Sequence, residues 1–425
     1  MGYRLKRAAA AFALVAAVAV LSAGAAVAGS GGSSTAANDY AKSAAVGGVD
    51  PQILANADTI AHWSFTYTDP TNGETYPITM VGSDPRGGGS TTIHTVIIPL
   101  SISITAGNQD TSVLDDLTYS GFRADNVSHT FDGTTKVSRV LASPIFQSNK
   151  YDRDLGGDTG QYGDVFMRAQ FAKIGSGYHV RLVNDSVYPT VSMDVPTMQG
   201  LAYHRPAGAL AGVVSSSWFS AQLQNLMGSL HISPDVVPIF LTDNVMLYGT
   251  NFRDCCTIGY HGAGESTGLS SGSANGNGNQ PVQTFIYSAY SAPGTYPTST
   301  ALNPSRYIQD IHALSHEVAE WLDDPFVNNV VNPWLTPSAP QYGCTDYLET
   351  GDPVVGVWFP LKGNADAGSG GVWHPEDEVN FNWFARGAAA GLGLESWDGR
   401  HTFMGPRTTS INSIYASFAN FAQGC

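Results

Sequence analysis

The sequence predicts an α+β or α/β fold, with a mixed β-sheet, one prominent helix at about 305–322 and a loop-rich C-terminal region. Three observations predict this class. Short segments in which apolar and polar residues alternate recur from about residue 60, as expected of half-buried strands. The apolar run at 236–241 has the composition of a fully buried strand. Apolar residues at helical spacing then occupy the segment between Pro304 and Pro325.

The predicted elements follow one another along the chain. Strand candidates occupy 61–67, 95–104, 178–183, 236–241, 245–248 and 284–290. We expect 236–241 and 245–248 to be a buried strand and its neighbour. The helical spacing of Trp218, Leu223 and Leu226 predicts a further helix over 217–230. The last hundred residues are rich in Gly, Trp and Pro and carry few regular signals.

The N-terminal segment has the features of a secretory signal peptide over residues 1–28. Basic residues precede an apolar run at 8–21, and an A-x-A-like cleavage site ends at Ala28. The run is too short and too rich in Ala for a good membrane anchor. We expect a flexible linker at 29–55 and a single large globular domain at 56–425. The β-rich part of that domain would end at residue 230, and the metal-site part would follow it. The sequence thus predicts a secreted protein with no membrane attachment after cleavage.

Composition restricts the partners of the chain. It has 425 residues, a formal net charge of −15 and only 13% charged residues. Nucleic acids and anionic membranes both require a basic face, so the acidity argues against either as a partner.

The chain has four cysteines, all in its C-terminal half: Cys255, Cys256, Cys344 and Cys425. An even count in an exported chain predicts two disulfides, for which three pairings are possible. Adjacent cysteines rarely bond each other, so we expect Cys344 to pair with Cys255 or Cys256. A thiolate metal site is the alternative, although the spacing matches no C-x-x-C pattern.

The helix near residue 310 carries the motif H-E-x-x-E at His316, Glu317 and Glu320. Residues four apart share a helix face, so His316 and Glu320 can bind one metal ion together. In H-E-x-x-H zinc hydrolases, two such side chains hold zinc and the Glu accepts a proton from the bound water. A Glu replaces the second His here, and a carboxylate is a legitimate zinc ligand. The motif predicts a zinc site with Glu317 as catalytic base. The alternative is a helix end with solvated charges.

A catalytic zinc ion needs a third protein ligand. His261 is the first choice, because it ends the strand block before the helix and stands close to the Cys pair. Alternatively, His261 is an ordinary loop histidine. Further candidate ligands are His312, Asp323, Asp324, Asp352 and His374. Candidates to polarise a substrate carbonyl are Tyr260, Tyr347, His374 and His401. A separate acidic cluster lacks calcium-loop spacing and is expected to be a solvated loop: Asp152, Asp154, Asp158 and Asp164.

The segment SHEVAE at 315–320, followed by Asp324 and Pro325, resembles a segment of the plant phosphate-induced, or Exordium-like, secreted proteins. It also resembles bacterial exported proteins with an HExxE helix. Similar elements on either side of the helix are Cys256 with residues 259–261, and Cys344 with residues 351–352. The likeness covers roughly residues 255–352, and His312 departs from the plant pattern. The resemblance implies a link to cell-wall and growth responses, and a site similar to that of divergent zinc metallopeptidases.

These observations predict a secreted zinc-dependent peptide hydrolase that acts on a peptide, a protein or cell-wall material. In this hypothesis His316, Glu320 and His261 hold zinc, and Glu317 is the general base. The alternative is a noncatalytic extracellular binding protein of the Exordium-like kind. Glu317 separates the two, because a binding module needs no proton acceptor beside its metal ion.

Overall fold

The computed structural model of the protein confirms the predicted class, with helices and strands in mixed sheets. It describes residues 49, 54, 57–110, 123–151, 157–204, 209–249, 255–265, 281–297, 307–335, 344–354, 356–363 and 371–404. The expected signal peptide and most of the expected linker lie outside the described residues. The described α-helices are α4 (Val137–Leu141), α5 (Tyr162–Gln170), α6 (Ser216–Leu230), α7 (His312–Asp323) and α8 (Phe381–Phe384).

The largest sheet contains eight of the described strands and is mixed. These are β3 (Ser90–Ile104), β5 (His129–Asp132), β8 (His179–Val187), β9 (Val191–Asp194), β12 (Val236–Asp243), β15 (Gly259–Glu265), β16 (Val282–Pro297) and β17 (Tyr307–Asp310). Strands β8, β3, β12 and β16 pair in parallel, in that order. Strand β15 pairs antiparallel with the outer side of β16. The sheet therefore joins strands from before and after residue 230.

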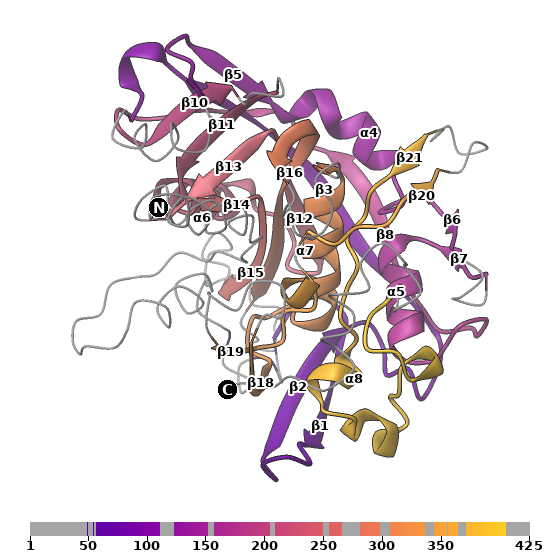
Figure 1. The fold of residues 1–425 in the computed structure, drawn as a ribbon. Coiled ribbons are helices and arrows are strands. Elements are labelled where there is room, and N and C mark those ends of the chain that lie inside the picture. Colours follow the sequence, from indigo (N-terminus) through magenta and orange to yellow (C-terminus); the bar gives the residue numbers. More distant parts are fainter. Residues whose placement is uncertain are drawn as a thin grey trace, which may run out of the picture.

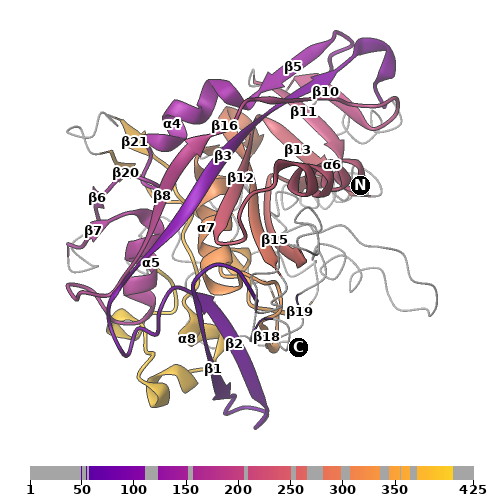
Figure 2. The same cartoon turned by 180° about the vertical axis from the view of Figure 1, so that it is seen from behind.

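Strand β3 shows why both faces of this sheet are buried. Ile97 lies in the apolar core that also contains Leu314 of α7. Its neighbours Val96 and Ile98 lie in a second core, which contains Phe219 of α6. Alternate side chains of a strand point to opposite faces, so β3 is apolar on both. Figure 1 shows α7 and α5 on one face, and Figure 2 shows β3 crossing the sheet with α6 on the opposite side.

A second sheet of five described strands lies beside the first. Its strands are β4 (Arg123–Ala124), β10 (Gly200–His204), β11 (Leu210–Ser215), β13 (Val245–Tyr248) and β14 (Cys255–Thr257). The interpretation of 245–248 as the neighbour of 236–241 is wrong, because β13 pairs with β11 and β14. Asn244 separates β12 from β13 and has a φ of 53°, which turns the chain out of the first sheet.

Short hairpins and 3₁₀ turns complete the described fold. The hairpins are β1 (His62–Thr68) with β2 (Thr75–Val81), β6 (Asn149–Lys150) with β7 (Thr159–Gly160), β18 (Val330–Leu335) with β19 (Cys344–Tyr347), and β20 (Leu361–Lys362) with β21 (Val372–Trp373). The 3₁₀ helices are η1 (Ala106–Asn108), η3 (Gly133–Lys136), η7 (Asp352–Val354), η9 (Ala388–Leu392) and η10 (Trp397–Gly399). Across the described residues, every helix falls short of the length and apolar character needed to cross a bilayer.

The helix predicted at about 305–322 begins later than expected, at His312. Residues 307–310 form β17, which pairs antiparallel with β16, and only Ile311 separates β17 from the helix. Asp310 ends this strand with a φ of 47°, and the chain then enters the helix. A partner strand far away in sequence thus overrides the local helical pattern. Pro304 lies outside the described residues.

The cysteines lie on strands that lead into the candidate site. Cys256 in β14 and Cys344 in β19 are both disulfide-bonded, and no described cysteine is free. Cys425 lies outside the described residues. The pairing of the four sulfurs stays a prediction.

We expect all four cysteines to be oxidised, with Cys344 joined to Cys255 or Cys256. Such a bond would tie β14, just before β15, to β19, and the segments that follow both strands contribute to the site described below. Thiol titration of the unfolded, unreduced protein should find no free thiol, and peptide mapping should recover Cys344 linked to 255–256. Four titratable thiols would contradict the prediction and would revive the thiolate alternative.

Candidate metal centre

Helix α7 is held against the sheet by its apolar face. Leu314, Val318 and Trp321 belong to the core shared with α5 and the large sheet. The indole Nε1 of Trp321 donates a hydrogen bond to Oγ1 of Thr284 in β16, at 3.1 Å. Gly163 in α5 has no side chain, and this gives Leu322 and Val318 room to pack. The helix is therefore fixed in rotation, and its opposite face is directed at β15 and the C-terminal segments.

The polar face of α7 is buried as completely as its apolar face. His312, His316, Glu317 and Glu320 all have 0% of their surface exposed. The alternative of a helix end with solvated charges is therefore wrong. Ionisable groups are rarely buried unless they are paired or bind a metal ion, so the contacts of each one are informative.

His316 is placed by both of its ring nitrogens. Nε2 lies 3.1 Å from Oε1 of Glu320, one turn along the helix, and 3.9 Å from Oδ1 of Asp352 at the start of η7. Nδ1 lies 3.0 Å from Oε2 of Glu376. Burial would lower the pKa of His316, but the charges of Glu320 and Glu376 outweigh burial and hold that pKa well above its usual value.

Glu376 connects both histidines of α7 to the C-terminal segment. Its Oε2 also lies 2.7 Å from Nε2 of His312, and its Oε1 accepts a hydrogen bond from the backbone N–H of Gly356 at 2.8 Å. Its own N–H donates to Oγ of Ser315. Burial would raise the pKa of Glu376, but the two histidines outweigh burial and lower it, so the group stays ionised. When one ring nitrogen of a histidine binds a metal ion, the other ring N–H usually donates to a carboxylate, and Glu376 has this position relative to His316.

We expect Glu376→Gln to weaken metal binding by His316 about 10- to 100-fold, as loss of such carboxylate partners does elsewhere. The amide keeps the shape of the side chain but cannot hold the imidazole with the same charge. Competition with a chelator of known affinity would measure the change. Glu395→Gln, at an exposed position, is the matched control. Equal affinities in the two variants would contradict the role of Glu376.

His261 in β15 faces the same helix from the sheet. Its Nε2 lies 3.1 Å from the backbone carbonyl oxygen of Asp324, and a carbonyl can only accept. Its Nδ1 lies 3.4 Å from Oε2 of Glu317 and 3.8 Å from Oε2 of Glu320. Burial lowers the pKa of His261, but the hydrogen bond and the charge of Glu317 outweigh burial and raise it.

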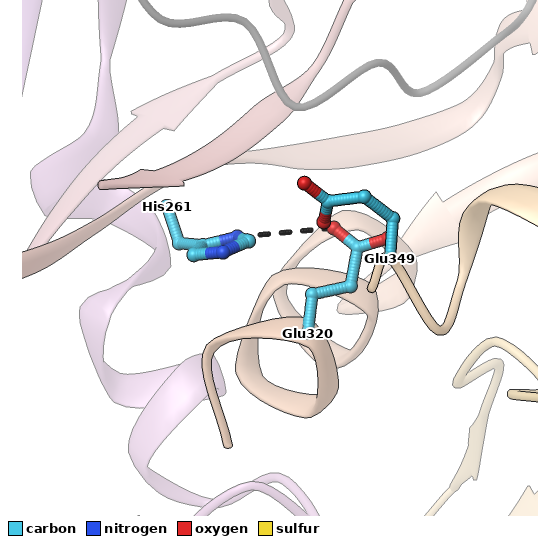
Figure 3. A group of neighbouring side chains, drawn as sticks. All are labelled: His261, Glu320 and Glu349. Atoms are coloured by element: carbon cyan, nitrogen blue, oxygen red, sulfur yellow. Dashed lines mark ion pairs between the residues drawn. The ribbon is translucent and has the colours of Figure 1, made fainter. Parts of the chain in front are cut away.

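The described ligand atoms form two groups that share Glu320. One group contains His316, Glu317 and Glu320, and the other contains His261, Glu320 and Glu349. Within each group the potential ligand atoms lie within 4.8 Å of one another, and all the residues are buried. Figure 3 shows the second group, in which His261 faces the neighbouring carboxyl groups of Glu320, on α7, and Glu349. The protein therefore has buried His and Glu groups close enough to hold a metal ion.

The residues present fit a metal ion, because the atoms that face each other lack hydrogen-bond partners. Buried side-chain atoms without one are Nε2 of His316, Oε1 of Glu317, Oε2 of Glu320, Oε2 of Glu349 and Oδ1 of Asp352. Leaving such an atom buried and unsatisfied costs about 1–3 kcal/mol each, and more when it is charged. One nitrogen and several carboxylate oxygens are suitable ligands for a divalent ion such as zinc.

Two glycines make room for the polar face of the helix. A Cβ on Gly351 would overlap the imidazole ring of His316. A Cβ on Gly259 in β15 would lie 2.7 Å from Cγ of Glu317, closer than real contacts allow. Each of these positions therefore requires glycine so that a site side chain can pack against backbone.

The carboxylates of the centre have no lysine or arginine partner among the described ion pairs. Burial, with the negative charge of Glu320 next, holds the pKa values of Glu349 and Asp352 well above their usual range. Burial also raises the pKa of Glu317, to about 7. Among the described residues, histidines are the only basic groups in ion pairs with these carboxylates. The centre therefore needs either bound protons or a cation.

The structure also locates the other sequence candidates. His312 contacts Glu376, and Asp323 accepts from Nε2 of Gln170 at 2.6 Å, so both face structural partners. Oδ1 of Asp324 accepts from the backbone N–H groups of residues 328 and 329. His374 pairs with Asp310 at 2.6 Å. Hydroxyl groups of Tyr260 and Ser220 lie 3.2 Å apart.

The remaining candidates lie on other segments of the chain. Tyr347 is partly exposed in β19, and His401 is in the C-terminal segment after η10. In the acidic cluster, Asp158 pairs with Arg168 and Asp164 pairs with His179, so these carboxylates have protein partners. Asp152 and Asp154 lie outside the described residues.

Sequence reasoning missed Glu349 and Glu376. Glu349 stands two residues before the Gly351-Asp352 pair that the sequence singled out, and this proximity was the available signal. Glu376 lies in the acidic run 376–378, which gives no periodic pattern. Tyr162 in α5 donates to Oε1 of Glu378 in the same run, at 2.7 Å. These groups reach α7 from irregular segments, which local patterns cannot place.

Comparison of the chain with protein-family models, with curated proteins and with solved structures gave no match.

Proposed function

We propose that the protein is a secreted zinc-dependent peptide hydrolase whose ion is held by His316 and Glu320. One observation carries this proposal: Nε2 of His316 and Oε1 of Glu320 lie 3.1 Å apart on fully buried side chains. Nε2 nevertheless has no hydrogen-bond partner, so the two atoms are placed as ligands of a common ion. Asp352 is our third ligand, because its unpartnered Oδ1 lies 3.9 Å from the same nitrogen. His261, the third ligand expected from the sequence, faces the other oxygen of Glu320.

Glu317 has the position of a general base. It belongs to the same ligand group as His316 and Glu320, and its Oε1 is buried without a partner. Its Oε2 lies 3.4 Å from Nδ1 of His261, which fixes the carboxylate in place. A zinc ion held at this site would act as a Lewis acid and lower the pKa of a coordinated water to about 7.

The chain's own residues then account for the proton transfer. Glu317 accepts a proton from the attacking water as the new C–O bond forms at the substrate carbonyl. The same carboxyl group returns that proton to the leaving amine as the C–N bond breaks, so no other acid or base is required. His261 holds Glu317 in the orientation that both transfers need.

The purified mature protein tests this function directly. We expect stoichiometric zinc on metal analysis and cleavage of members of a broad peptide library, with cleavage lost in the presence of a chelator and regained with added zinc. Protein that neither contains nor takes up metal would refute the site. Protein that binds zinc and cleaves nothing in the library would favour the Exordium-like alternative, a noncatalytic extracellular binding protein.

A further inference from the structure

We propose that a second divalent metal ion binds between His261, Glu320 and Glu349, so that Glu320 bridges two ions. This inference rests on the proposed function, because it adds an ion beside the one held by His316. The second group of ligand atoms comes from three separate parts of the chain: β15, α7 and the turn after β19 (Figure 3).

The tautomer of His261 supports the second ion. Its Nε2 faces the carbonyl oxygen of Asp324 at 3.1 Å, so this nitrogen carries the proton. In the neutral ring, Nδ1 then has a lone pair, and that lone pair faces Oε2 of Glu317 and Oε2 of Glu320. Nδ1 and these oxygens approach favourably only with a proton or a metal ion between them, and the proposed second ion takes the place of the proton. A ring N–H bound to a backbone carbonyl is also the usual support of a metal-binding histidine.

The two oxygens of Glu320 have different surroundings. Oε1 faces His316 and accepts hydrogen bonds from the backbone N–H groups of Gly351 and Asp352, at 3.2 and 3.3 Å. Oε2 faces His261, is fully buried and has no hydrogen-bond partner. One carboxylate thus presents one oxygen to each histidine, which is the arrangement of a bridging ligand.

Glu349 and Asp352 divide between the two sites. They lie three residues apart on one short segment, and each has a buried oxygen without a partner. Asp352 approaches His316, whereas Glu349 falls in the group of His261. Only 5% of the surface of Glu349 is exposed, so water does not solvate its charge.

The charges of the centre match two ions better than one. Glu317, Glu320, Glu349 and Asp352 together carry four negative charges when ionised. Three of them form ion pairs with histidines, and none is described for Glu349. One divalent ion balances half of this charge, and the remaining buried carboxylates would then have to bind protons. Two divalent ions balance all of it. Carboxylate-bridged pairs of divalent ions are established in hydrolytic enzymes, including aminopeptidases.

Metal stoichiometry tests the inference without reference to activity. Metal-free protein is dialysed against buffered Zn²⁺, and the bound zinc is measured by elemental analysis. We expect two equivalents for the wild type, one for Glu349→Gln and two for the control Glu395→Gln, whose side chain is exposed. Circular dichroism establishes that each variant is folded. The amide of Gln preserves the shape and packing of Glu349 while removing its charge.

Each other outcome has a definite meaning. One equivalent in the wild type, lost in His316→Ala, refutes the second ion and leaves the proposed function intact. No zinc in the wild type refutes both. Two equivalents in Glu349→Gln refute the second site at this position. If Glu349→Gln fails to fold, the wild type is loaded with Co²⁺ instead, and the magnetic coupling between the bound ions is measured. Magnetic coupling between two ions supports the bridge through Glu320, and two independent signals refute it.

Discussion

Replacement of His316 by Ala is expected to remove zinc from the proposed catalytic site and to abolish hydrolysis with it. The imidazole supplies the only nitrogen in the group of His316, Glu317 and Glu320, and its loss leaves two carboxylates crowded together. Bound metal stabilises only the folded state, by about 2.7 kcal/mol when free metal is at 100 times its dissociation constant. The wild type should therefore unfold at a lower temperature in the presence of a chelator.

Calorimetry with and without chelator measures this difference. His316→Ala should show a much smaller response to the chelator than the wild type, in proportion to the metal that it has lost. His94→Ala is the matched control, since His94 is an exposed histidine paired with Asp185 at 2.9 Å. A His316→Ala protein that retains the zinc content and the chelator response of the wild type would show that the ion lies elsewhere.

Replacement of Glu317 by Gln is expected to leave the metal in place and to remove hydrolysis. The amide has the shape of the carboxylate and fits the space opposite Gly259, so the fold should be kept. It cannot accept a proton, and loss of a general base typically lowers the rate about 10²- to 10⁴-fold. Metal analysis and single-turnover cleavage of a library substrate, measured on the same preparation, separate the two effects.

The opposite result has an equally clear meaning. If Glu317→Gln binds zinc and cleaves as fast as the wild type, Glu317 is not the base. Glu395→Gln serves again as the control for the general effect of replacing a Glu by a Gln. A change common to both variants would report on handling or folding, and a change confined to Glu317→Gln would report on the chemistry.

The sequence predicted the parts of the centre that depend on local geometry. His316 and Glu320 lie one turn apart, and a helix brings such residues together whatever surrounds it. His261 was also predicted to join them, and it does face Glu320, from the opposite oxygen. The sequence pattern did not predict that the whole polar face of α7 is buried, because charged residues at a helix end are usually solvated.

The remaining differences have tertiary causes. Residues 307–310 follow a helical pattern but become β17, because β16 offers them a strand to pair with. Residues 245–248 leave the first sheet at Asn244, where asparagine tolerates the positive φ, but one such residue does not predict which sheet the next strand joins. Glu349 and Glu376 come from irregular segments that reach α7 only in the folded chain. Periodicity cannot locate groups of this kind, since their neighbours lie far away in sequence.

The parallel pairs of the large sheet join strands that lie far apart in the sequence. Ile97 of β3 pairs with Ile239 of β12, and Ile239 pairs in turn with Ile286 of β16. Parallel pairs so distant along the chain close large loops before they gain contacts, and such topologies fold slowly. His261 and His316 lie on the strand and the helix added around β16, and Glu376 follows later still. The ligand set comes together only when these distant segments have met, so metal uptake during refolding would report that the native chain topology has formed.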